Sequence, residues 1–239
     1  MNRRLILAFA AAAVLVTAGA GGVDVYFFSG VRTSPTALTL SPISSPALGR
    51  SPLSGDPAGT WKVASGSVAG YRVHETFAGQ SSLHEAVART SVVTGFLSAS
   101  SNGAAVGVTG IDFTADLTAL HSVDQVAGHD VSQRDSVVSR SLEMNRFPTA
   151  IFKASAVTLP GDFTTGATDS LSVQGQLTVH GVTRDVIAAV QVRLNGAQVQ
   201  LDGSIQVQMS DFNITPPQAP FVTLQTAVTV EFQLFLTKS

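Results

Sequence analysis

Cysteine is absent from all 239 residues of this sequence, and its absence excludes several kinds of site at once. Without thiols the chain can form no disulfide framework, cysteine zinc site, thiol nucleophile or lipid-anchored cysteine. The composition is still compatible with a secreted domain, because a chain of this length can bury a core that is stable without crosslinks.

Charged side chains are also few: they make up 13% of the residues, which is about half the usual share. The formal net charge is −2, so no excess of lysine and arginine is available to attract a phosphate backbone. We therefore predict that nucleic acid is not a partner.

Common catalytic motifs are missing as well. The sequence contains no Gly-x-Ser-x-Gly, no phosphate loop and no Gly-x-Gly-x-x-Gly. The His-Glu pairs at 74–75 and 84–85 lack the second histidine of a zinc motif, and His121 and His129 are not at a compact ligand spacing. Structural or solvated roles are favoured for these histidines, and no metal or cofactor is predicted.

The N-terminus is typical of an export segment. Arg3 and Arg4 precede an uncharged run from Leu5 to Val23. Residues 1–28 are therefore either a signal peptide cleaved after the small residues 18–20 or an uncleaved transmembrane anchor. We favour the anchor, which predicts a single-pass membrane protein with an extracytoplasmic domain; cleavage would give a secreted or periplasmic one.

Residues 29–58 are rich in proline and serine and have little apolar periodicity. Such a composition predicts a disordered, semi-extended tether. The tether is either a spacer from the membrane or a tolerated surface tail, and composition does not separate the two.

From residue 59 onward, apolar and polar residues alternate, which is typical of half-buried antiparallel strands. The alternation is clearest in 111–117, 198–209 and 226–238. An Asp-Gly hairpin turn is predicted within 201–204. Further strands are expected at 67–77, 89–99, 103–109, 149–159, 170–180 and 182–194.

These patterns predict an all-β fold in which about eight antiparallel strands close into a barrel. Closure removes the two long edges that a single open sheet would expose. A sandwich is the alternative, but several of the expected strands are longer than sandwich strands usually are. Residues 134–143 have helical spacing instead, which predicts one short helix near the barrel mouth.

Two pairs of adjacent residues are candidate sites. Arg134 and Asp135 could bind a polar head group, although Asp135 also suits the first turn of a helix, where a negative charge complements the helix dipole. His180-Gly181 lies between two alternating runs, which favours a hairpin turn. A less favoured hypothesis is an enzyme that uses His180 with Asp135 or Asp185 for proton transfer.

Five segments together resemble the YceI-like family of polyisoprenoid-binding periplasmic or extracellular proteins, and the resemblance covers residues 60–239. Arg134-Asp135, Phe147-Pro148 and His180-Gly181 match paired residues of the family motif. The N-terminal segment and residues 69–75 are similar to a membrane-tethered actinobacterial branch. The resembling segments are 66–75, 88–99, 111–122, 133–155 and 173–190.

The resemblance implies that residues 59–239 form a lipocalin-like eight-stranded barrel around a polyisoprenoid lipid or isoprenoid quinone, with no chemistry on the ligand. It implies head-group or mouth roles for Arg134, Asp135 and His180. Membrane attachment through the N-terminal segment and a homodimer are further expectations. The alternative is a cell-envelope stress-response protein with a filled core. The expected lipid-lining residues are Phe77, Phe96, Phe113, Leu142, Phe147, Phe152, Leu177 and Phe232.

This sequence departs from the family at two places. Residues 123–133 form a longer stretch before Arg134, which predicts an enlarged loop at the mouth. Residues 136–144 are less polar than the family sequence, which leaves the head-group preference open.

Overall fold

A computed structural model describes residues 32–40, 56–77, 83–102, 105–126, 132–160, 163–217 and 222–239. The predicted signal or anchor, residues 1–28, lies outside these ranges. Within them, no helix has the length and apolar character needed to cross a membrane.

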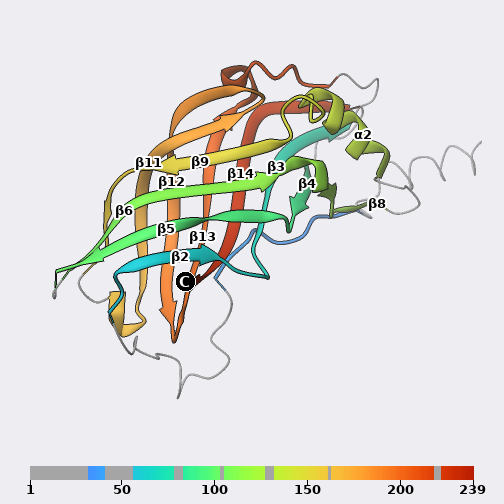
Figure 1. Cartoon of the computed structure of the whole chain (residues 1–239). Coiled ribbons are helices and arrows are strands. Elements are labelled where there is room, and N and C mark those ends of the chain that lie inside the picture. The colour runs from blue at the N-terminus through green and yellow to red at the C-terminus, as the bar shows by residue number, and fades with distance from the viewer. Residues whose placement is uncertain are drawn as a thin grey trace, which may run out of the picture.

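Eight antiparallel strands close into a ring, because β13 pairs with both β12 and β14 (Figure 1). The predicted eight-stranded barrel with one short helix is confirmed. The helix, α2, spans Ser132–Ser141 and lies within two residues of its predicted bounds. In ring order the strands are β13 (Gln198–Gln208), β12 (Val182–Asn195), β11 (Thr168–Val179), β9 (Thr149–Ala154), β6 (Val106–Asp116), β5 (Val93–Ser101), β2 (Gly59–Val63) and β14 (Val222–Lys238).

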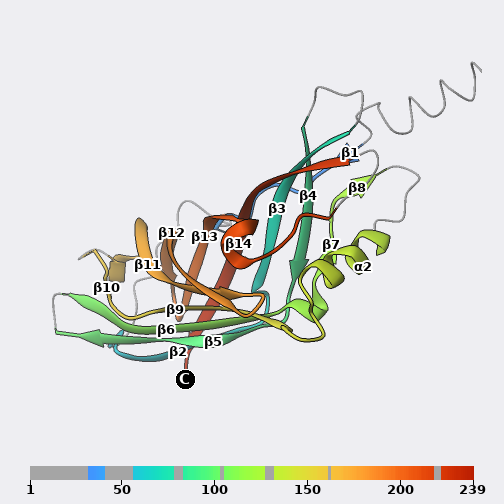
Figure 2. The same cartoon turned by 90° about the horizontal axis from the view of Figure 1, so that it is seen from above.

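The barrel is closed at one end and splayed at the other, because two strands share one edge of β14. The last residues of β14, 236–238, pair with β2, whereas residues 222–233 of the same strand pair with β3 (Val68–Phe77). β4 (His84–Thr90) and β7 (His121–Ser122) extend the sheet from β3, away from β5 and β6 (Figure 2). We call the end lined by β3, β4 and α2 the mouth, and the end at β2 the closed end.

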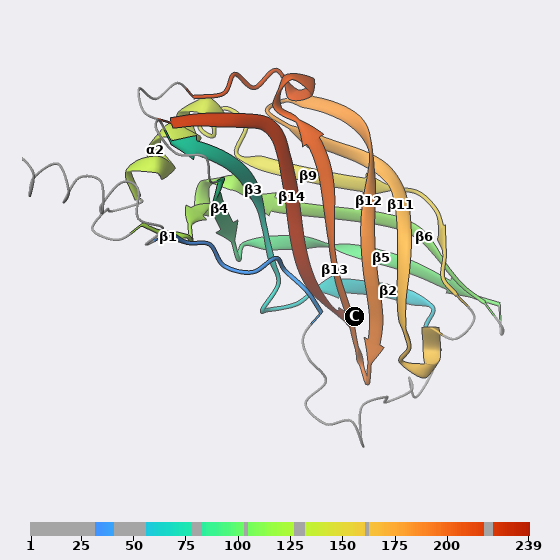
Figure 3. The ribbon, with the colours of Figure 1, turned by 180° about the vertical axis from the view of Figure 1, so that it is seen from behind.

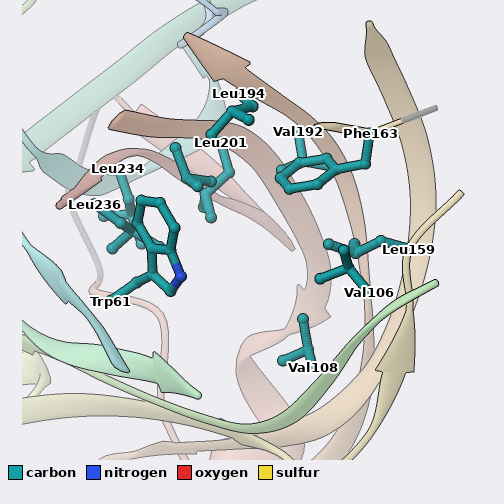
Figure 4. Close-up of a cluster of buried hydrophobic side chains, with 11 residues drawn as sticks. Trp61, Val106, Val108, Leu159, Phe163, Val192, Leu194, Leu201, Leu234 and Leu236 are labelled. Atoms are coloured by element: carbon teal, nitrogen blue, oxygen red, sulfur yellow. The ribbon is translucent and has the colours of Figure 1, made fainter. Parts of the chain in front are cut away.

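A dense apolar plug fills the closed end (Figure 4). Trp61 lies beside Leu234 and Leu236, and its indole Nε1 donates to the carbonyl of Pro57 at 3.0 Å. Satisfying this N–H removes the cost of burying it. The plug consists of Trp61, Val106, Val108, Leu159, Phe163, Val192, Leu194, Val199, Leu201, Leu234 and Leu236.

The predicted turn at 201–204 is wrong, because Asp202 and Gly203 lie inside β13 and pair with both neighbouring strands. Gly203 is needed there for close approach: a Cβ would lie 2.4 Å from the Ala189 carbonyl oxygen and 2.7 Å from the Phe232 ring. The β12–β13 turn instead lies at 196–197, where Gly196 has φ 60°.

Several strand boundaries also differ from expectation. The expected strand 89–99 is the end of β4 and most of β5, with a turn in which the Val92 amide donates to Thr90 Oγ1 at 3.1 Å. One strand, β6 (Val106–Asp116), takes the place of the two pieces expected at 103–109 and 111–117. The expected strand 149–159 divides into β9 and the two-residue β10 (Val157–Thr158). The short elements are η1 (Leu117–Ala119), η2 (Phe163–Thr165), η3 (Met209–Phe212), β1 (Arg32–Thr33) and β8 (Gln125–Val126).

Residues 32–40 depart from the predicted disordered tether. They lie along the outside of β3, β4 and β14 and run from the α2 side toward the C-terminus (Figure 3). The rest of the predicted tether up to residue 55 is outside the described ranges.

Candidate functional site

The inside of the barrel holds two apolar cavities that share part of their lining. The one nearer the mouth has a volume of about 170 Å³, and the inner one about 120 Å³. Small side chains where they meet leave room that larger residues would fill. The residues lining both cavities are Ala69, Ala115, Ala150, Leu177 and Val230.

The mouth cavity is roofed by α2, which contributes Val138, Ser141 and Leu142. Besides Ser141, the polar side chains that line the mouth cavity are those of Tyr71 and Thr90. Burial raises the pKa of Tyr71 well above its ordinary value of 10, even though the nearby Arg134 charge acts to lower it. The phenol therefore stays neutral, and the cavity lining carries no formal charge.

The inner cavity continues from the mouth cavity toward the plug. Phe113, Phe152 and Phe232 line it together with aliphatic residues of β11, β12 and β13. Thr114 is its one polar side chain within the described lining. The two cavities together form an apolar path that begins under α2 and ends at the closed end.

Five of the eight residues expected to line a lipid tunnel lie in these cavities. Leu142 lines the mouth cavity, Leu177 lines both cavities, and the other three residues line the inner cavity. These three are Phe113, Phe152 and Phe232.

The other three expected lining residues lie elsewhere. Phe96 is 41% exposed on the outer face of β5. Val93 and Leu97 of the same strand face the inner cavity, so strand alternation points Phe96 outward. Phe77 is the last residue of β3 and pairs with Val222. Phe147 packs against the β11–β12 hairpin rather than against a cavity.

The sequence interpretation missed several lining residues of the mouth cavity. Val228 and Val230 share the phase of Phe232 on β14, so strand alternation contained the information. Met209 and Phe212, which also line the mouth cavity, come from η3, where the alternation that ends at residue 209 gives way to a short turn.

His180 and Gly181 form the predicted two-residue hairpin turn, since Val179 pairs with Val182. Their φ angles are 52° and 71°, as a primed turn requires. His180 Nδ1 lies 3.1 Å from the carbonyl oxygen of Phe212, which ties the hairpin to η3. The imidazole also meets the Phe147 ring edge-on, with centroids 5.2 Å apart. The two family motif blocks thus pack directly on each other.

The carboxylates proposed to act with His180 are engaged elsewhere. Asp185 accepts a hydrogen bond from Gln176 at 3.0 Å, and Asp135 accepts from the amide and hydroxyl of Ser122 at 2.9 and 2.7 Å. The acid nearest His180 Nε2 is Glu143, at 3.5 Å. This arrangement lends no support to proton transfer by His180 and these aspartates.

Arg134 and Asp135 hold α2 over the mouth cavity. Arg134 Nη1 donates to both carboxylate oxygens of Asp124, at 2.8 and 2.9 Å. The Asp124 side chain is fully buried and also accepts from the Val87 amide, with His84 Nε2 3.3 Å away. Since Asp135 bonds Ser122, both charges of the pair connect the first turn of α2 to the chain after η1.

Replacing Arg134 with methionine should destabilise the protein by about 3 kcal/mol, because it leaves the buried Asp124 carboxylate without its cation. Urea denaturation would measure the loss. Arg140→Met, at the exposed end of the same helix, is the matched control and should stay within about 0.5 kcal/mol of wild type. Equal losses in the two variants would contradict the anchoring role.

The Asp124 ion pair also predicts a dependence on pH. Burial acts to raise the pKa of Asp124, but hydrogen bonds from His84, Arg134 and the Val87 amide and the Arg134 charge outweigh it, so the pKa lies below 3.8. A lowered folded-state pKa contributes stability that is complete above the unfolded value and is lost as pH falls through the folded one. The stability difference between wild type and Asp124→Asn should therefore shrink below about pH 4. Denaturation over a pH series checks this, with Asp185→Asn as the exposed control; an unchanged difference would overturn it.

No group of three or more histidine, aspartate and glutamate side chains that could hold a metal occurs among the described residues. His84 Nε2 lies 3.3 Å from an Asp124 oxygen and 3.7 Å from a Glu75 oxygen, and Arg134 pairs with the same Asp124 carboxylate. This cluster serves as an ion-pair network in the structure.

The sequence model of the YceI-like domain matches residues 64–236, most of the chain. This protein belongs to the YceI-like family. Among solved structures, a polyisoprenoid-binding domain from Saccharophagus degradans, implicated in plant cell wall breakdown, is similar at 18% identity and TM-score 0.53. The match covers 76% of this chain and 99% of that one.

Two more solved structures are similar with lower TM-scores. BcnA of Burkholderia cenocepacia is 20% identical with a TM-score of 0.47, over 69% of this chain and 95% of its own. The Campylobacter jejuni YceI protein is 10% identical with a TM-score of 0.45, over 64% and 84%. No curated protein sequence matches this YceI-like chain.

Proposed function

We propose that this YceI-like protein binds the chain of a polyisoprenoid lipid or isoprenoid quinone inside its barrel and performs no chemistry on it. The observation that carries this proposal is the pair of adjoining cavities with an almost wholly apolar lining. An apolar cavity of about 150 Å³ stays dry and takes up a molecule such as benzene. Burying a hydrocarbon there gains about 25 cal/mol for each Å² removed from water.

The shape of the lining favours a slender, unbranched or methyl-branched chain. The two cavities meet at three alanines, Leu177 and Val230, where a bulky ring system would not pass. With no formal charge in the lining, a polar head group belongs at the mouth, beneath α2 and close to Tyr71. The polyisoprenoid-binding domain of Saccharophagus degradans shares this fold, which further supports the isoprenoid class.

An extracytoplasmic location completes the proposal. It rests on the arginines and the uncharged run of residues 1–28, which are typical of export. A carrier for an insoluble chain is useful in an aqueous compartment next to a membrane. The cavities favour this function over the alternative of an interaction protein with a filled core.

The bound lipid should be directly identifiable. We expect organic extraction of the full-length protein, purified from its native membrane fraction, to yield a prenyl lipid at close to one molecule per chain. Native mass spectrometry would show the same mass released from the intact complex. A protein that contains no prenyl lipid and takes up no labelled polyprenol would refute the proposal.

A further inference from the structure

A short N-terminal segment, residues 32–40, is docked on the outside of the barrel, and we call it the strap. It begins at the mouth, where β1 pairs with β8 and Ser34 Oγ donates to the carbonyl of Glu85 at 2.6 Å. β8 follows Asp124, the partner of Arg134 on α2. The strap therefore starts beside the helix that roofs the mouth cavity.

From the mouth the strap runs along the barrel toward the closed end. Arg72 and Arg89 donate to the carbonyls of Pro35 and Thr36 at 2.6 and 2.7 Å. The Leu38 amide donates to Glu231 at 3.3 Å, and Gln233 donates to the carbonyl of Thr39. The blue segment in Figure 3 follows this course.

The strap covers charges that a barrel would otherwise expose. Arg72, Glu231 and Asp202 face outward yet are only 8%, 2% and 7% exposed. Arg72 pairs with Glu231 at 2.7 Å and with Glu85 at 2.9 Å. Two backbone carbonyls of the strap accept hydrogen bonds from the arginines of this network, so the position of the strap is specific.

The strap also changes the meaning of the predicted spacer. The proline-rich residues after the strap connect Leu40, whose amide bonds Asp202, to Asp56, whose carbonyl accepts from Lys238 at 2.6 Å. Both flanks are bound to the barrel, so these residues add no distance between barrel and anchor. Only Asp24–Val31, eight residues, separates the apolar run from the strap.

We propose that the strap holds the barrel with its mouth facing the membrane, an inference that rests on the lipid-binding function and on the uncleaved anchor. Even if all eight residues lay outside the bilayer and were fully extended, they would span about 29 Å at most. β12, with 14 residues, is about 46 Å long, or roughly 35 Å along the axis of a tilted barrel. The linker is thus too short to let the closed end face the membrane while the strap is docked.

This orientation suits the exchange of an insoluble chain. A lipid tail that leaves the bilayer would meet the α2 roof and the mouth cavity first, without crossing open water. The partner of the mouth is therefore the surface of the membrane that holds the anchor.

The absence of cysteine allows a direct test on the full-length protein. A fluorophore would be attached at Asn145→Cys, exposed beside the mouth, or at Lys62→Cys, exposed on β2 at the closed end. The protein would be reconstituted in phosphatidylcholine vesicles that contain nitroxide-labelled head groups. We expect severalfold stronger quenching at position 145. Equal or stronger quenching at position 62, or failure of the protein to float with the vesicles, would overturn the proposal.

A matched pair of strap variants shows whether the strap sets the orientation. Leu38→Asp places a second carboxylate next to Glu231 and should release the strap, which would reduce the difference in quenching. Thr36→Asp adds the same charge at an exposed position beside Arg89 and should preserve it. An unchanged difference in Leu38→Asp would contradict the role of the strap.

The quenching experiment is independent of lipid content. Asymmetric quenching in a protein without prenyl lipid would refute the proposed ligand alone. Bound prenyl lipid with symmetric quenching would refute the orientation alone.

Discussion

Replacing Ala115 with phenylalanine is expected to eliminate bound lipid while the barrel stays folded. Ala115 lines both cavities, and its β6 position faces their junction with Ala69 and Leu177. The added ring would occupy the junction and leave no continuous path for a chain. Because existing space accommodates much of the ring, the cost in stability should be near the lower end of the 1–3 kcal/mol typical of overpacking. Lipid extraction with mass spectrometry, and thermal unfolding, measure the two effects.

The matched control is the same substitution on the outer face. Ala189 is exposed on β12 and points away from both cavities, next to the inward-facing Ala188. Ala189→Phe should keep the full amount of lipid. If Ala115→Phe retains lipid at the wild-type level, the cavities are not the binding site.

Replacing Gly181 with alanine is expected to cost about 3 kcal/mol of stability, the sum of two separate effects. Its φ of 71° lies in the left-handed region, which costs an L-residue about 1–2 kcal/mol. A Cβ would also lie 2.5 Å from Cε1 of Phe147, which forces the ring or the hairpin to shift. Chemical denaturation of the variant checks the loss.

Gly66 separates the two effects. Its φ is 89°, but a Cβ would meet only the Phe235 ring at 3.5 Å, an ordinary contact. Gly66→Ala should therefore lose only the conformational part, about 1–2 kcal/mol. Equal losses at positions 66 and 181 would show that the contact between Phe147 and the hairpin contributes little.

The sequence allowed accurate prediction where one local pattern has one structural meaning. Alternation over ten or more residues predicts a long half-buried strand, and β11, β12 and β14 formed as expected. A glycine between two such runs predicts a hairpin, and the turn at 180–181 was found. The family motif added the ring closure, which periodicity alone left open against a sandwich.

Prediction failed where the same local pattern serves two purposes. Asp202-Gly203 has the composition of a turn, but Gly203 is there because the Phe232 ring and the next strand come too close for a side chain. The aromatic character of Phe96 favours the interior, although its side chain lies on the outward face of β5. The family resemblance implies a head-group role for Arg134, but its guanidinium pairs with Asp124, ten residues earlier in the chain.

The amino-acid sequence by itself determined the all-β class, the hairpin at His180, the short helix and the family, because each depends on neighbours in the chain. Only the tertiary structure decided which aromatic side chains face the cavities, what α2 is anchored to, and where residues 32–40 lie. These depend on residues far apart in the chain: Glu231, for example, bonds Leu38 across 193 positions. Such contacts exist only after the barrel has closed, because closure is what brings β14 beside β3 and buries the charges that the strap covers.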